Sequence, residues 1–211
     1  ELITDIKRLN FWVNEAKRIG LIAVDTETTS LDAVQAKLVG VSIALYAGKA
    51  CYIPLRHIIN NGNEQELFLN ENKLSTESSM EQIPVEIVLP ILKDLFEDCS
   101  VLKIGHNIKY DMLVLKQPDN GMININSFHD TMCMSYVIDA SRFNHKLDTL
   151  SLDILNYTTI KFEEVCGKGS KQIKFDCVNL QDALTYAAED ADVCLRLYER
   201  FKNELFENKL N

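Results

Sequence analysis

The segment Leu21-Ile22-Ala23-Val24-Asp25-Thr26-Glu27-Thr28 decides the fold, because an apolar run leads directly into two carboxylates. Such a run predicts a buried β-strand. Residues i and i+2 of a strand point to the same side of a sheet, so Asp25 and Glu27 converge on one place. Like charges at the edge of a hydrophobic core are tolerated only when they are protonated or neutralised by cations. The segment therefore predicts a site for divalent metal ions at the end of this strand.

Patterns along the rest of the chain predict the remaining architecture. Residues 37–46 and 50–54 are apolar and rich in β-branched side chains, and Ala47-Gly48-Lys49 between them indicates a hairpin. A short buried strand is expected at 101–105. Helices are expected over residues 4–18, 84–98, 108–115, 130–140, 148–155 and 179–208. This order is typical of an α/β, ribonuclease H-like fold: a mixed five-stranded sheet, with an antiparallel meander of strands 1–3 plus parallel strands, flanked by helices.

Helix ends and loops carry more specific expectations. Asn107 is expected to cap the helix over 108–115. Pro90 is expected to kink the helix over 84–98 or end it early, because proline lacks an N–H. Residues 56–82 predict a long surface loop with a short helix near 64–69. Residues 157–175, rich in glycine and lysine, show no clear period.

Length and charge limit the class of protein. The chain has 211 residues, enough for a single α/β domain over 1–211, and it begins with Glu1 rather than Met, so we expect a piece of a longer polypeptide. The net charge of −9 argues against a domain that holds long duplex nucleic acid by electrostatics alone, although bound metal can hold a few nucleotides. No long apolar window or signal pattern is present, which predicts a soluble, cytoplasmic protein.

Two further segments place acids where a strand or helix could aim them inward: Asn107-Ile108-Lys109-Tyr110-Asp111 and Tyr186-Ala187-Ala188-Glu189-Asp190. Each acidic segment is ambiguous by itself. Asp25 and Glu27 could also belong to a turn at the end of a strand, and Asp111 could be a solvated surface acid. Glu189 and Asp190 could lie on an ordinary solvent-exposed helix face. Tyr186 and Asp190 lie i, i+4 apart, so a phenol and a carboxylate share one helix face.

In combination and order, these segments resemble the three motifs of the DEDD superfamily of 3′-5′ exonucleases. The tyrosine four positions before the last Asp resembles the tyrosine-bearing branch, since the other branch has His where this chain has Thr185. Further matches look like the proofreading domain of the bacterial-type DNA polymerase I family and extend the resemblance over roughly residues 21–197. They are Thr29-Ser30-Leu31-Asp32, Leu38-Val39-Gly40-Val41-Ser42, Tyr52-Ile53-Pro54, Ile104-Gly105-His106 and Phe162-Glu163-Glu164-Val165-Cys166-Gly167-Lys168-Gly169.

The resemblance implies a two-metal site with carboxylate ligands, Asp25, Glu27, Asp111 and Asp190. The cofactors would be two divalent cations, Mg²⁺, with Mn²⁺ or Zn²⁺ as substitutes, since hard cations prefer oxygen ligands. Asp25 would bridge both ions, and Asp111 would hold the second, partly through water. Tyr186 would orient the attacking water, because a phenol with a pKa near 10 is a better positioner than base.

The substrate-binding residues that the resemblance implies are Leu31, which would press against the terminal base, and Asn107, Tyr110 and Phe162 along the single-strand path. Core packing is the alternative for Leu31 and Phe162. His106, also assigned to substrate binding, stands where the family often has Gln, and Asn144 stands where a basic residue is common, so the hold on the substrate is expected to differ there. Four lysines against two glutamates between 161 and 174 offer a further backbone contact.

These features predict a 3′-5′ exodeoxyribonuclease that edits single-stranded or frayed DNA 3′ ends and releases nucleoside 5′-monophosphates. The expected partners are that DNA end and a polymerase module in the same chain, with a monomeric, nucleoid-associated protein and no membrane. Two alternatives remain open. One is a 3′-5′ exoribonuclease similar to ribonuclease D, and the other is a non-catalytic domain that braces a polymerase.

Overall fold

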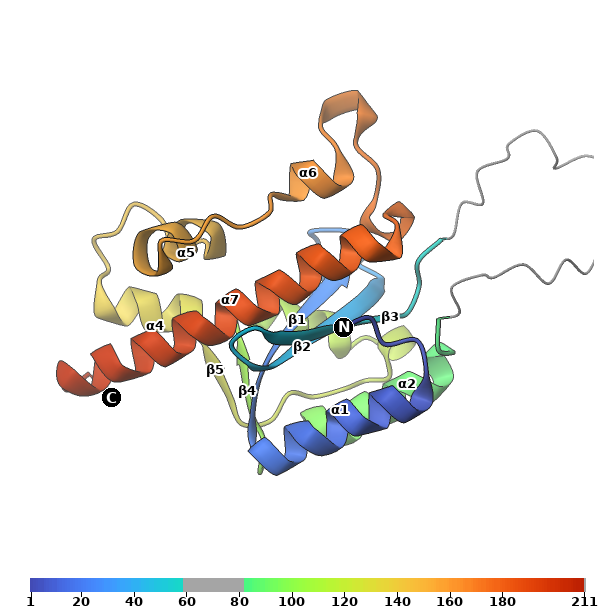
Figure 1. Ribbon diagram of the computed structural model, residues 1–211, viewed down its shortest axis with the longest axis horizontal. Coiled ribbons are helices and arrows are strands. Elements are labelled where there is room, and N and C mark those ends of the chain that lie inside the picture. Colours follow the sequence, from blue (N-terminus) through green and yellow to red (C-terminus); the bar gives the residue numbers. More distant parts are fainter. Residues whose placement is uncertain (59–81, 211) are drawn as a thin grey trace, which may run out of the picture.

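The computed structural model describes residues 1–58 and 82–210, which build a mixed sheet in the order β3-β2-β1-β4-β5 (Figure 1). The strands are β1 (Leu21–Thr28), β2 (Leu38–Tyr46), β3 (Lys49–Pro54), β4 (Leu102–Gly105) and β5 (Phe128–Asp130). The first three strands pair antiparallel, while β4 is parallel to β1 and to β5. The predicted five-stranded mixed sheet with its meander is therefore confirmed. The fifth strand, β5, was not located from the sequence.

Helices cover both faces of this sheet (Figure 1). They are α1 (Ile6–Ile19), α2 (Val85–Phe96), α3 (Lys109–Leu115), α4 (Thr131–Ile138), α5 (Leu147–Leu155), α6 (Phe162–Cys166) and α7 (Leu180–Glu207). Helix α7 crosses one face, and α1 and α2 lie against the other. Each of the six helices expected within the described residues, over 4–18, 84–98, 108–115, 130–140, 148–155 and 179–208, is present, with its ends within two residues of the expected positions.

Strand β1 separates two hydrophobic clusters by its alternating side chains. Ile22 and Val24 pack with α1 and α2, whereas Ala23 packs with Ala191 and Cys194 of α7. Because strand side chains alternate with a period of two, Asp25 and Glu27 continue the Ala23 side and face α7. The acids therefore lie under the longest helix, at the end of an otherwise apolar strand.

Two predictions concern the ends of helices. Pro90 was expected to kink α2 or end it early, and the early end is wrong, because α2 continues to Phe96 with Pro90 exposed. Asn107 does not cap α3, since Ile108 precedes the helix and no side-chain cap bond is made there. Asn107 instead has φ 60, a left-handed conformation that asparagine tolerates better than most residues.

The glycine and lysine segment is also more ordered than its lack of periodicity indicated. It contains the short helix α6 and two single 3₁₀ turns, at 169–171 and 175–177. Gly167 and Gly169 have positive φ angles there, which most other residues would adopt only with strain. Of the predicted loop over 56–82, residues 59–81 lie outside the described residues, and so does the short helix expected near 64–69.

Candidate active site

Three carboxylates meet between β1 and α7. One oxygen each from Asp25, Glu27 and Asp190 lies within 4.8 Å of the others. Helix α7 can approach β1 this closely because its buried face carries small residues at four-residue spacing, Ala183, Ala187 and Ala191. The sequence prediction that acids distant in the chain converge is fulfilled for these three.

Three carboxylates this close together and shielded from water cannot all stay ionised unless cations neutralise their charge. Burial, followed by repulsion from Asp190, raises the pKa of Asp25 to about 8. Burial and the neighbouring Glu189 raise the pKa of Asp190 to about 7, while the Tyr186 hydroxyl acts to lower it. Burial and the charges of Asp25 and Asp190 raise the pKa of Glu27 well above its ordinary value. Without cations, part of the cluster is protonated near neutral pH.

The carboxylate of Glu27 is incompletely satisfied. The side chain is 8% exposed, and within the described part of the chain its Oε1 is buried without a hydrogen-bond partner. A buried polar atom without a partner is costly, and a bound cation or an ordered water would satisfy it. The donor set, three carboxylates with one orphaned oxygen, therefore suits a hard divalent cation.

Asp111 lies beside this cluster but is held separately. It is 3% exposed, so the alternative of a solvated surface acid is wrong. Its Oδ1 accepts hydrogen bonds from the Thr26 backbone N–H (3.0 Å) and the Thr26 hydroxyl (2.5 Å). Burial and the charge of Asp25 raise its pKa well above the ordinary range. Asp111 is therefore electrostatically coupled to Asp25, although it is not a member of the 4.8 Å group found among the described residues.

Thr26 was not singled out in the sequence. Its position between the two acids places it on the opposite side of β1, where it can reach α3 rather than α7. Only the contact with Asp111, 85 positions away, shows that it holds a site residue.

Tyr186 lies one helical turn before Asp190, as its spacing predicted. Its ring packs against Phe162 (6.4 Å between centroids) and Phe175 (5.9 Å). Burial, and then the charge of Asp190, raise its pKa above the ordinary phenol value. The hydroxyl therefore keeps its proton at neutral pH and can orient a ligand, but it is a poor base.

Leu31 and Phe162 were assigned to the substrate, with core packing as the alternative. Leu31 is 97% exposed, so core packing is excluded for it, and Phe162 is 40% exposed and packs at a steep angle against Tyr186. The Tyr110 hydroxyl bonds with Thr28 Oγ1 (2.5 Å) and donates to the Ser30 carbonyl, which fixes the loop that carries Leu31.

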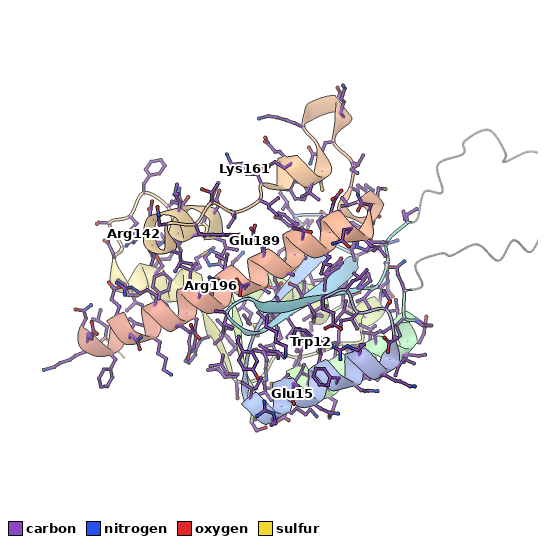
Figure 2. All side chains as sticks on the ribbon, in the orientation of Figure 1. Trp12, Glu15, Arg142, Lys161, Glu189 and Arg196 are labelled. Atoms are coloured by element: carbon purple, nitrogen blue, oxygen red, sulfur yellow. The ribbon has the colours of Figure 1, made fainter. Side chains whose placement is uncertain are left out.

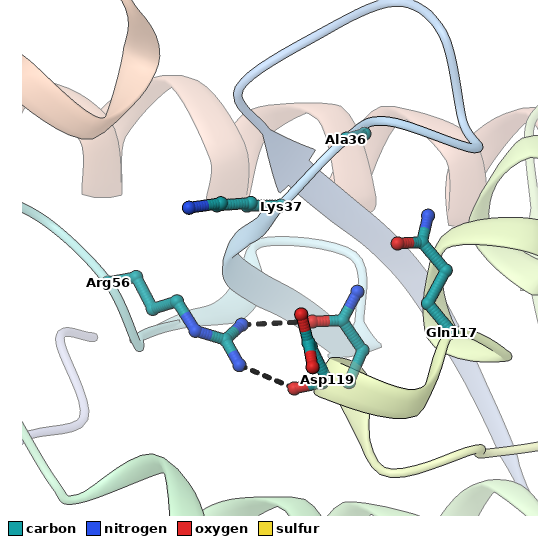
Figure 3. Close-up of a pocket in the computed structure, with 6 residues that line it drawn as sticks. Ala36, Lys37, Arg56, Gln117 and Asp119 are labelled. Carbon is teal, nitrogen blue, oxygen red and sulfur yellow. Dashed lines mark hydrogen bonds between the residues drawn. The ribbon is translucent and has the colours of Figure 1, made fainter.

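A polar pocket braces the other end of the same loop. It has a volume of about 310 Å³ and is lined by Ala36, Lys37, Arg56, Gln117, Asp119 and Asn120. Arg56 donates to the Asn120 side chain (3.0 Å) and to the Asp119 carbonyl (2.6 Å), as Figure 3 shows. Gln117 donates to the Ala33 carbonyl. This pocket holds none of the predicted site residues, so its clearest contribution is to support the loop after β1.

His106 and Asn107 lie between β4 and α3 and contact the start of α4. The carboxylate of Asp130 accepts the backbone N–H groups of Asn107 (3.0 Å) and Ile108 (3.1 Å) and also caps α4. His106 Nδ1 bonds with Thr131 Oγ1 (2.9 Å), while its Nε2 is buried and has no partner among the residues described. Burial lowers the pKa of this imidazole, so it is neutral at pH 7.

Glu189 is not the solvated acid that the alternative interpretation required. Its two oxygens accept the Tyr157 hydroxyl and the Ile160 N–H, both at 2.7 Å. In Figure 2, Glu189 points from α7 toward the segment that carries Lys161. This pair of bonds fixes the segment that leads to Phe162. Among the lysines that follow, Lys168 pairs with Glu163 (3.0 Å), so it is less available for a phosphate.

Comparison with known proteins decides the family. A family model described as 3′-5′ exonuclease matches residues 1–206. The chain belongs to this exonuclease family. It is 43% identical over 212 residues to DNA polymerase I of Rhizobium leguminosarum, and 39% identical over 205 residues to that of Pseudomonas aeruginosa. These matches cover 96% and 97% of this chain but 20% and 21% of the relatives, so the chain spans about a fifth of their length.

Solved structures share the fold at low sequence identity. Brucella melitensis NrnC with bound Mg²⁺ has a TM-score of 0.63 at 20% identity, over 92% of this chain and 77% of the other. Escherichia coli RNase D, an exoribonuclease, has a TM-score of 0.64 at 15% identity, over 98% of this chain and 45% of the other. The predicted ribonuclease H-like fold is therefore confirmed. In the described part of the chain, no helix combines the length and the apolar composition needed to cross a bilayer.

Proposed function

We propose that this exonuclease is a divalent-metal-dependent exodeoxyribonuclease that hydrolyses the terminal phosphodiester of single-stranded or frayed DNA 3′ ends and releases nucleoside 5′-monophosphates. The observation that carries the proposal is the convergence of the Asp25, Glu27 and Asp190 carboxylates within 4.8 Å beneath α7. The family membership supplies the reaction class. Substrate and metal identity are the proposed parts.

The cations would be held by Asp25, Glu27 and Asp190, with Asp111 beside them. Mg²⁺ is the expected ion, with Mn²⁺ or Zn²⁺ as substitutes, because the donors are carboxylate oxygens. Bound divalent ions supply charge neutralisation on the phosphate and a water of lowered pKa. In this assignment Asp25 would contribute to holding both ions, and Asp111, fixed by the Thr26 hydroxyl, would help to hold the second.

The remaining residues would bind and orient the strand. Tyr186 holds the attacking water through its protonated hydroxyl, since its pKa lies above the ordinary phenol range. Leu31 presses on the terminal base, and Phe162 and Tyr110 line the path of the strand. Because stacking and wedging read no base edges, a mismatched end is selected by its readiness to fray.

The kind of polypeptide in which this domain works is also part of the proposal. The relatives are whole DNA polymerases, about five times longer than this chain. We therefore propose that a polymerase module occupies the same polypeptide and hands frayed 3′ ends to this site during replication and repair. A monomeric state and a cytoplasmic, nucleoid-associated location also stay predictions.

The decisive experiment incubates the chain with a labelled DNA oligonucleotide, with Mg²⁺ or with a chelator. Asp25→Ala and Asp190→Ala should abolish cleavage while circular dichroism shows an unchanged fold. Full activity in either variant would refute the metal assignment. Mn²⁺ titration of the wild type also tests the bracing-domain alternative, because a purely structural domain should bind no metal pair.

The choice of DNA over RNA needs its own comparison, because RNase D shares the fold. Matched DNA and RNA single strands should be degraded by the same chain under identical Mg²⁺ concentrations. Faster degradation of DNA is expected, and a clear preference for RNA would overturn the exodeoxyribonuclease assignment.

A further inference from the structure

An aromatic surface lies on α4 and on the loop between α4 and α5. Phe143 is fully exposed there, and Tyr136 and Val137 are 52% and 56% exposed. We call Tyr136 and Phe143 the aromatic pair. Exposed aromatic rings supply flat apolar faces on which another ring can stack.

Tyr136 presents a flat ring that is already held in place. Its ring stacks on His145 with 3.6 Å between centroids and 25° between planes, and Ser135 Oγ fixes His145 Nδ1 at 2.8 Å. One face of Tyr136 is therefore covered by the imidazole, and its exposed surface remains open to a third ring. This arrangement lowers the entropy lost on stacking, because the tyrosine is immobilised beforehand.

Tyr136 is connected to a proposed substrate-binding residue through His145. The backbone of His145 lies beside the His106 ring, and His106 immediately precedes Asn107. At the other end, Tyr110 holds the loop that carries Leu31. His106 and Tyr110 lie on either side of Asn107 in the chain, so the residues proposed to bind the strand and the His145 that supports Tyr136 are joined through His106.

The charges near the aromatic pair favour base stacking over binding of a backbone phosphate. Arg142, the basic residue next to Phe143, lies 3.7 Å from Asp139 and 3.8 Å from Asp153, so its charge is already compensated. Figure 2 shows Arg142 on the same side of α7 as Glu189 and Lys161. A partner that binds here is therefore recognised by flat apolar faces rather than by charge.

We propose that Tyr136 and Phe143 form a stacking platform for bases of the single strand several nucleotides upstream of the 3′ end. The platform rests on the proposed function, because it extends the same substrate path. It would make affinity depend on strand length, since a dinucleotide fills the cleavage site without reaching the aromatic pair. Its contribution should be insensitive to salt, because stacking releases no counterions.

The test measures binding by fluorescence anisotropy in an Asp190→Asn background, which prevents degradation of the probe. The probes are an eight-nucleotide oligo-dT and the dinucleotide dTdT. Phe143→Ala should weaken binding of the longer probe by at least about fivefold and leave dTdT binding unchanged. Phe143→Trp should retain the affinity of the parent. The ratio between parent and Phe143→Ala should be the same at low and high salt.

Phe206→Ala is the matched control, since Phe206 is also highly exposed (72%) but lies sixteen residues from Asp190, about 24 Å along α7. Equal binding of the octamer by Phe143→Ala and parent would overturn the platform, leaving this surface to a protein contact. An equal loss on both probes would also overturn it, because that result indicates a distorted cleavage site. Failure of the proposed function is seen separately, as absence of Mg²⁺-dependent cleavage by the wild type.

Discussion

Asp111 and β1 belong to segments far apart in the chain, and the Thr26 hydroxyl joins them. A buried carboxylate needs donors, and Asp111 receives two from one residue. Glu27, by contrast, has one buried oxygen without a hydrogen-bond partner among the described residues, which is the expected difference between an acid oriented by the protein and an acid that binds a cation. The four carboxylates therefore differ in their hydrogen-bond partners, and for Asp111 a single residue, Thr26, makes that difference.

Thr26→Val should reduce cleavage by about tenfold and raise the Mg²⁺ concentration needed for half-maximal activity, because Asp111 loses its hydroxyl donor. The free energy of unfolding should fall by about 1 kcal/mol, since one buried hydrogen bond is lost. Steady-state cleavage rates across a Mg²⁺ titration, with urea unfolding alongside, measure both effects. Thr26→Ser keeps the hydroxyl and should behave like the wild type. An unchanged Mg²⁺ requirement in Thr26→Val would contradict the positioning role.

Tyr186→Phe should slow cleavage by about one to two orders of magnitude without stopping it, because a hydroxyl that orients water contributes less than a general base. Its ring contacts with Phe162 and Phe175 would be retained. Single-turnover rates at saturating Mg²⁺ measure the effect. A rate equal to that of the wild type would remove the water-positioning role.

Among the elements, α7 and β1 determine the site, and both were predictable. The apolar run before Asp25 and the long periodic segment after Asn179 have clear patterns, and Asn179 caps α7 through the N–H groups of Gln181 and Asp182. Shorter elements were harder to predict from the sequence. Strand β5 has three residues and α6 has five, too few to show a period. Contacts with β4 and α7 decide their conformation.

Helix α2 continues through Pro90, although proline has no backbone N–H to donate and its ring crowds the preceding helical turn. Pro90→Ala should therefore raise the free energy of unfolding by about 1–3 kcal/mol, because it restores a helical hydrogen bond at an exposed position. Urea denaturation of both proteins is the measurement. Pro84→Ala, just outside the helix, is the control and should gain much less. A loss of stability in Pro90→Ala would show that the proline is required for packing.

For the molecule as a whole, the carboxylate cluster links stability to pH. The pKa values of Asp25 and Asp190, about 8 and about 7 in the folded chain, exceed the ordinary value of about 3.9 expected after unfolding. The folded chain therefore binds more protons than the unfolded chain between these limits. Stability contributed by the protonated acids is fully present below about pH 4 and is lost as the pH rises toward 8.

Without metal, the free energy of unfolding should accordingly decrease between pH 5 and pH 8, measured by urea denaturation in a chelator. Added Mg²⁺ should reduce this decrease, because a cation stabilises the ionised acids in the folded state only. Asp190→Asn should show a shallower pH dependence in the chelator. A flat profile in the metal-free wild type would argue that the cluster is ionised without cations.

The sequence by itself determined which residues are acidic, which faces of strands and helices are apolar, and where most helices begin and end, because these follow from local periodicity and capping. It also indicated the motif order from which the family could be inferred. Only the tertiary structure decided that Asp190 approaches β1, that Thr26 holds Asp111, that Leu31 is exposed and that Asn107 is no cap. Those outcomes depend on packing between segments distant in the chain, and no local pattern encodes such distances.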